Sequence, residues 1–100
     1  ALLDEERTHL VHQIHALFME LEEAHRRLDL YEGGLIPISR QAVLSAKSAY
    51  LTGKIEFGML VTLLRNRFQT ESAYYEALVN HESKIAELEA LLGEPFGVRP

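Results

Sequence analysis

Cysteine is absent from this chain of 100 residues. Its absence excludes disulfide bonds, thiolate zinc sites and cysteine nucleophiles. Long apolar runs are absent as well, because the longest uncharged and strongly apolar segment, Phe57–Leu64, has eight residues. A helix that crosses a bilayer needs about 20 apolar residues. We therefore expect that the chain, residues 1–100, makes no direct contact with a membrane.

Basic residues are scarce: 10 Lys and Arg stand against 15 Asp and Glu, which gives a net charge of −5. Phosphate binding needs a basic face, so we expect no nucleic-acid partner. Apolar residues make up 47% of the chain and charged residues 25%. This balance is typical of a folded helical protein, and the length predicts a single domain spanning residues 1–100.

Glycine and proline are few, six and three respectively, and they stand where helical patterns end. Gly33-Gly34 interrupts the first pattern, and Pro37 suits the first turn of a new helix, where its missing N–H costs nothing. Gly53 and Gly93 follow the next two patterns, as glycine commonly does at a helix C-terminus. The sequence thus predicts an all-α fold with helices at about 4–32, 37–51 and 55–92.

Thr52-Gly53-Lys54 is the predicted corner between the second and third helices, and so short a connection makes its helices antiparallel. Apolar residues of the first helix alternate at steps of four and three, which indicates a coiled-coil-like seam. They are Leu10, Ile14, Leu17, Leu21, Ala24, Leu28 and Tyr31. A register centred on the corner then pairs Ala46 with Leu60, Ala42 with Leu64, Ile38 with Phe68, and Tyr31 with Tyr75.

We therefore predict a long antiparallel helical hairpin whose first arm is kinked or broken near residues 33–37. The alternative is a compact three-helix bundle that turns at Gly33-Gly34. Apolar residues that lie off the predicted seam of the third helix, among them Phe57, Val61 and Tyr74, exceed what a two-helix hairpin should leave exposed. A second packing surface is therefore expected, for self-association or for docking onto further helices.

Histidine supplies the candidate metal ligands. Three histidines recur every third residue on the side away from the seam, so we interpret them as a solvated polar face. They are His9, His12 and His15. The hairpin register sets His25 opposite His81, and Glu22 precedes His25 at the Glu-x-x-His spacing of di-iron bundles, but the third helix has no second such pair. We interpret the two histidines as a polar layer that sets helix register and predict no metal site, while a metal-binding hairpin stays open as an alternative.

Features of an enzyme active site are missing from the sequence. No serine has a nucleophile-elbow context, and there is neither a phosphate-binding loop nor a dinucleotide-binding fingerprint. We therefore expect no enzymatic activity and no cofactor.

Four segments follow one another in a definite order: Leu30–Pro37 (LYEGGLIP), Ala49–Phe57 (AYLTGKIEF), Tyr75 and Ala86–Gly93 (AELEALLG). In order and spacing they resemble the C-terminal periplasmic hairpin of TolC-type outer-membrane efflux proteins. The resemblance is strongest to the branch associated with heavy-metal and related tripartite exporters, and it covers about residues 28–93.

The resemblance implies a trimeric conduit with a long α-helical barrel in the periplasm, whose hairpin tips meet a periplasmic adaptor protein. The family's Tyr-x-x-Gly tip motif falls on Tyr50 and Gly53. The implied adaptor-binding tip comprises Tyr50, Leu51, Thr52, Gly53, Lys54 and Ile55. The chain departs from the family at Met59 and Thr62, where many members carry the acidic residues of a ring at the pore entrance.

On this interpretation the chain is a fragment of a homo-oligomeric outer-membrane protein and lies in the periplasm. It would reach an inner-membrane pump only indirectly, through the adaptor. A stand-alone helical-hairpin module for interaction or dimerisation is the main alternative function, and a hairpin that binds metal through histidines is the second.

Overall fold

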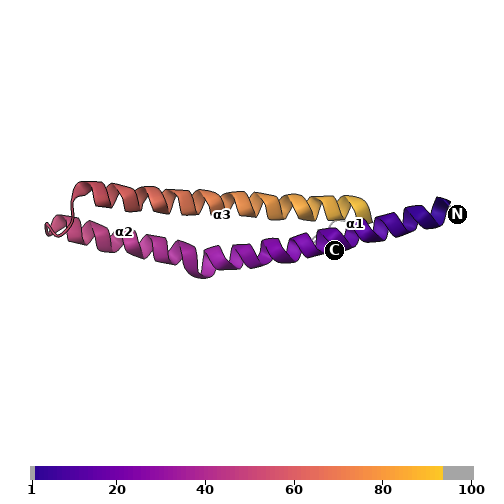
Figure 1. Ribbon diagram of the computed structural model, residues 1–100, viewed down its shortest axis with the longest axis horizontal. Helices are drawn as coiled ribbons and strands as arrows, with labels where there is room; N and C mark the ends of the chain where they lie inside the picture. Colours follow the sequence, from indigo (N-terminus) through magenta and orange to yellow (C-terminus); the bar gives the residue numbers. More distant parts are fainter. Residues whose placement is uncertain (1, 94–100) are drawn as a thin grey trace, which may run out of the picture. The chain divides into compact units, whose positions relative to one another are not determined.

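A computed structural model describes residues 2–93 of the chain. Its elements are α1 (Leu2–Leu30), the π-helix η1 (Tyr31–Leu35), α2 (Ile36–Leu51) and α3 (Phe57–Leu92) (Figure 1). The described residues contain no strand, and the chain reverses between α2 and α3, which confirms the predicted antiparallel helical hairpin with a modified first arm. Residue 1 and residues 94–100, the ends of the predicted domain, lie outside the described residues.

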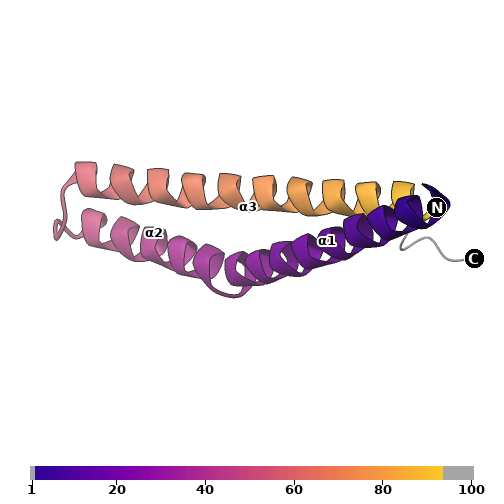
Figure 2. The ribbon, with the colours of Figure 1, turned by 45° about the vertical axis from the view of Figure 1, so that its right-hand side comes forward.

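The chain forms two compact units. The first unit contains the residues up to Arg26 together with those from Leu78 onward, and the second unit is Arg27–Ala77. Each unit places a piece of the first arm beside an antiparallel piece of α3 (Figures 1 and 2). The second unit also contains η1, α2 and the corner.

The corner has the hydrogen bonds of a Schellman motif, which satisfy the last carbonyls of α2. The Lys54 N–H donates to the Ala49 carbonyl at 2.8 Å, and the Gly53 N–H donates to the Tyr50 carbonyl at 3.0 Å. Gly53 has a φ of +76°, a left-handed conformation that glycine adopts without a Cβ clash. The predicted glycine corner is therefore confirmed.

The diglycine does not stop the helix or reverse the chain, as the three-helix bundle would require. Residues 31–35 form a π-helix, in which the Ile36 N–H donates to the Tyr31 carbonyl, and the chain bulges outward there (Figure 2). Pro37 explains the local change, because it has no N–H to donate to Gly33 and its ring clashes with the carbonyl four residues earlier. The wider π turn relieves both problems.

Buried side chains mark the interior of each unit. They are Leu17, Ala24, Leu28, Ser39, Val43 and Ala46 in the first arm, and Leu60, Ala77 and Leu88 in α3. The predicted burial of Ala46 and Leu60 is thus confirmed. The predicted pairing of Ile38 with Phe68 is wrong, since the two residues are 66% and 72% exposed.

The π-helix accounts for the exposure of Ile38. In an uninterrupted α-helix, a seam that alternates steps of three and four from Leu28 would reach Ile38 and Ala42. A π turn accommodates one extra residue, so the buried positions move on by one, to Ser39 and Val43.

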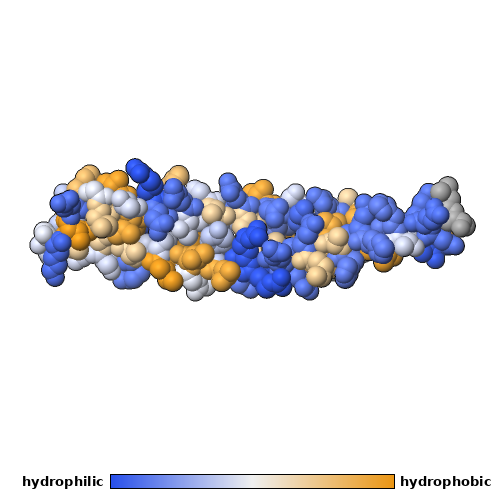
Figure 3. Space-filling view, in the orientation of Figure 1, coloured by the Kyte–Doolittle hydropathy of each residue, from blue (hydrophilic) through white to orange (hydrophobic). Residues whose placement is uncertain are grey.

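α3 presents a different face to its neighbour than the one predicted. Its buried and half-buried positions include Leu60, Leu63, Arg67, Thr70, Tyr74, Ala77, His81, Lys84, Leu88 and Leu91. Leu64, Phe68 and Tyr75, which the sequence pattern placed on the seam, are exposed and form what we term the outer stripe. Apolar residues reach the surface over α2 and the adjacent part of α3 (Figure 3). Hydrophobicity alone gave the wrong face because the more apolar stripe of this helix is the outer one.

Candidate functional site

The predicted tip, residues 50–55, lies at the corner of the second unit. Leu51 is the last residue of α2 and is 77% exposed, and the three residues after it are exposed as well. Tyr50 is only partly available, because its ring packs against the ring of Phe57 with centroids 5.5 Å apart. Ile55 is half-buried. The structure thus brings the predicted tip residues together, with Leu51 as their most accessible apolar side chain.

The tip also leaves room for a partner to approach its backbone. No atom lies within 4 Å of the position that a Cβ on Gly53 would occupy. Beside it, an open groove of about 460 Å³ runs along α2 and ends at Thr52 and Lys54. The Thr52 hydroxyl donates to the Ser48 carbonyl at 3.1 Å, which helps to hold the end of α2. An exposed corner with a hydrogen-bonded backbone, beside an open groove, is suited to contact with another protein.

A tyrosine cluster lies next to η1 in the second unit. The Tyr74 hydroxyl donates to the Glu32 carboxylate at 2.6 Å, and this hydrogen bond raises the pKa of Tyr74. The Tyr31 ring meets the Tyr74 ring edge to face at 6.2 Å, so Tyr31 faces Tyr74 and not Tyr75 as predicted. Sequence reasoning missed this cluster. Glu32 and Tyr74 lie at equal distances along the chain on either side of Gly53, as His25 and His81 do, so the same register could have paired them.

Charged residues of the second unit connect α2 to α3. The Arg40 guanidinium lies 3.0 Å from the Glu71 carboxylate, which also lies 3.7 Å from Arg67 one helical turn away. Exposed ion pairs of this kind contribute about 0–1 kcal/mol each. They help to specify register more than they stabilise the fold.

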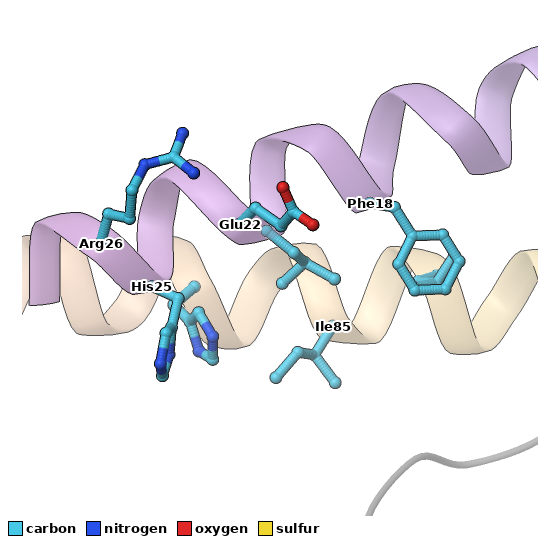
Figure 4. A pocket seen from close by; sticks show the side chains of 8 residues that line it. Phe18, Glu22, His25, Arg26 and Ile85 are labelled. Carbon is cyan, nitrogen blue, oxygen red and sulfur yellow. The ribbon is translucent and has the colours of Figure 1, made fainter. Parts of the chain in front are cut away.

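The first unit contains an open groove of about 500 Å³, which we term the histidine groove (Figure 4). Its lining residues are Phe18, Leu21, Glu22, His25, Arg26, His81, Ile85 and Leu88. The predicted opposition of His25 and His81 is confirmed, since their ring centroids are 6.3 Å apart with the planes inclined by 41°. The groove is mostly apolar, and the two imidazoles are among its few polar groups.

His81 has an unusual environment within this groove. Its Nδ1 atom is buried and makes no hydrogen bond with any described residue, and the nearest carboxylate oxygen, from Glu82, is 3.8 Å away. Next to the groove, the Lys84 ammonium pairs with the Glu20 carboxylate at 2.9 Å, which raises the pKa of Lys84. The other histidines at positions 9, 12 and 15 are all exposed.

No group of three or more His, Asp or Glu side chains within residues 2–93 is arranged to hold a metal ion. No helix in the same range combines the length and the apolar character needed to cross a membrane.

Comparisons with known proteins do not assign the chain to a family. It matches no protein-family model, and no significant similarity to a curated protein or to a solved structure was found.

Proposed function

We propose that this chain is part of the periplasmic α-helical barrel of a TolC-type outer-membrane efflux duct, and that its tip engages a periplasmic adaptor protein of a tripartite exporter. The observation that carries the proposal is the tip itself. Leu51 is exposed, the Gly53 backbone is open to approach, and the Schellman hydrogen bonds fix both in place. A preorganised tip loses little conformational entropy on binding, which favours recognition by a partner helix.

The outer stripe supports the oligomeric part of the proposal. Leu64, Phe68 and Tyr75 are exposed at a spacing of four and seven residues, which places them on one face of α3. In the same stretch, Arg67 and Thr70 occupy half-buried positions against the first arm. A helix that evolved to fold with one partner would turn its most apolar face toward that partner. This arrangement is better suited to a hairpin that packs beside further copies in a homo-oligomer.

In this role the chain has no catalytic function and needs no cofactor. It would lie in the periplasm as part of an outer-membrane protein and would contact the inner-membrane pump only through the adaptor. The second candidate function is a stand-alone dimerisation module, which the outer stripe favours and which does not require the tip.

The test separates the two functions by the position of a charged substitution. The full chain is titrated with the purified adaptor protein of the same exporter, and self-association is followed by analytical ultracentrifugation. Leu51→Asp should weaken adaptor binding at least tenfold and leave self-association unchanged. Phe68→Asp should reduce self-association and leave tip binding intact. Both side chains are exposed, so neither substitution should unfold the hairpin.

Ile38→Asp is the matched control, because it adds the same charge to an exposed position at the other end of α2, about 20 Å from Leu51. If Leu51→Asp and Ile38→Asp weaken adaptor binding equally, the tip is not the binding site. If no variant alters adaptor binding but Phe68→Asp abolishes self-association, the dimerisation module is the correct function.

A further inference from the structure

We propose that His25 and His81 bind one divalent transition-metal ion, such as Zn²⁺ or Cu²⁺, across the histidine groove and thereby link α1 to α3. The proposal concerns the first unit alone and does not depend on adaptor binding by the tip. Imidazole is the commonest metal ligand in proteins, and it suits both ions.

The two imidazole rings lie close enough to share an ion. Two nitrogens that share a zinc ion lie about 3–4 Å apart, because each Zn–N bond is about 2.0–2.1 Å long. With the ring centroids 6.3 Å apart, nitrogens that face each other lie at the upper end of that range, and rotation of the side chains would bring them closer. Rotation about χ2 of histidine is soft, and His25 is exposed at the edge of the groove (Figure 4).

The environment of Nδ1 of His81 indicates which ring nitrogen would bind the ion. Nδ1 of His81 is buried and has no hydrogen-bond partner among the described residues, which is rare in proteins, so this nitrogen needs an acceptor and not an ion. Histidine ligands usually donate their second ring N–H to a carboxylate, which fixes the tautomer. Glu82 is the carboxylate beside Nδ1, at 3.8 Å. We therefore assign Nε2 of His81 as the ligand atom and Glu82 as a positioning residue that closes onto Nδ1 when the ion binds.

The charges that line the histidine groove are compatible with a bound cation. Glu22 lies on the same face of α1 as His25 and lines the groove, where it offsets the positive charges of Arg26 and of the ion. The structure does not bring Glu22 into a three-ligand group. The two histidines would supply two of the four ligands that zinc usually takes, and water molecules from the open side would supply the other two.

The test is titration of the full chain with Zn²⁺ alone, by calorimetry in a buffer that does not chelate metal. We expect one ion per chain and at least tenfold weaker binding for His25→Ala and for His81→Ala. Glu82→Gln should weaken binding about tenfold, the low end for loss of a carboxylate behind a ligand, because glutamine can still accept a hydrogen bond from Nδ1. A hundredfold excess of Zn²⁺ over its Kd should raise the melting temperature by about 10–20 °C, because the ion binds only the folded pair of helices. Imidazole ¹⁵N chemical shifts should identify Nε2 of His81 as the coordinating atom.

The control is a chain with His9, His12 and His15 all replaced by alanine, which should bind Zn²⁺ with unchanged affinity. Loss of binding in that variant would assign the metal to the exposed histidines and overturn the proposal. Half an ion per chain, or equal affinity in His25→Ala and in the unmodified chain, would also overturn it. Far-UV circular dichroism of each variant separates loss of a ligand from loss of the fold.

Discussion

Gly53→Ala tests whether the left-handed corner determines the stability of the second unit. The alanine methyl group would meet no atom within 4 Å, so steric contact adds nothing to the effect. The whole effect arises from the backbone, because a φ of +76° is strained for any residue with a Cβ. For an L-residue the left-handed conformation costs about 1–2 kcal/mol. We therefore expect the free energy of unfolding to fall by about 1–2 kcal/mol.

Gly33→Ala is the matched control. A Cβ at this position also meets no atom within 4 Å, but Gly33 lies in the helical part of the first arm and its φ is not positive. Alanine in a helix is more stable than glycine by about 0.5–1 kcal/mol, so this variant should be stabilised. The same chemical change thus has opposite expected signs at two positions of one unit, and the variants should differ by about 1.5–3 kcal/mol.

Urea unfolding of both variants, followed by far-UV circular dichroism, measures this difference directly. Equal stabilities, or a Gly53→Ala variant that is more stable than the unmodified chain, would refute the assignment of the corner as a strained left-handed turn. Adaptor binding by Gly53→Ala provides a second comparison, because an unchanged fold with weakened binding would locate the partner at the corner.

Three further predictions concern the packing of the helices. Leu88→Ala should lower the free energy of unfolding by about 2–4 kcal/mol, and Leu92→Ala by less than about 1 kcal/mol, because the two residues are 1% and 43% exposed. Urea unfolding measures both losses, and equal losses would contradict the difference in burial. The pKa of Tyr74 is raised from 10.0, so its stabilising hydrogen bond is intact below pH 10 and is lost as the pH rises through the higher folded pKa. The melting temperature should therefore fall less between pH 10 and 12 in Tyr74→Phe than in the unmodified chain, and parallel curves would contradict this. Pro37→Ala should convert the π turn to α-helix, which would move position 38 onto the buried seam. Thiol labelling of an Ile38→Cys variant, whose cysteine is the only one in the chain, should then become slower. An unchanged labelling rate would show that other contacts fix the register.

Local signals in the sequence were sufficient for the fold and for the corner. Glycine at position 53 and the short connection around it place the reversal of the chain, because few other residues adopt a left-handed φ. The opposition of His25 and His81 also follows from the sequence, since a register centred on the corner sets both positions at equal distances from it. These features depend on chain geometry and not on which face is most apolar.

The interior face of α3 could not be predicted from hydrophobicity. The sequence pattern selected Leu64 and Phe68 as core residues, and the structure exposes both. The half-buried Arg67 reaches Glu71 from the inward face, and the half-buried Lys84 reaches Glu20. Long basic side chains can cover apolar surface with their stems while their charged ends reach carboxylates. Periodicity identifies the stripes of a helix, but it does not say which stripe meets which partner.

The π-helix shows how a single proline can decide between two seams of similar quality. The seam of an uninterrupted α-helix would bury Ile38, Ala42 and Ser45, and the observed seam buries Ser39, Val43 and Ala46. Each seam contains one β-branched aliphatic residue, one alanine and one serine, so the two differ by a single methylene group, isoleucine against valine. Burial of one methylene group contributes only about 0.8 kcal/mol, and the two seams therefore differ little in hydrophobic free energy. A proline inside an α-helix costs about 3 kcal/mol, which is larger than that difference. The local backbone effect therefore determines the register, and it leaves Ile38 on the outside, where it adds to the apolar surface available to a neighbouring helix.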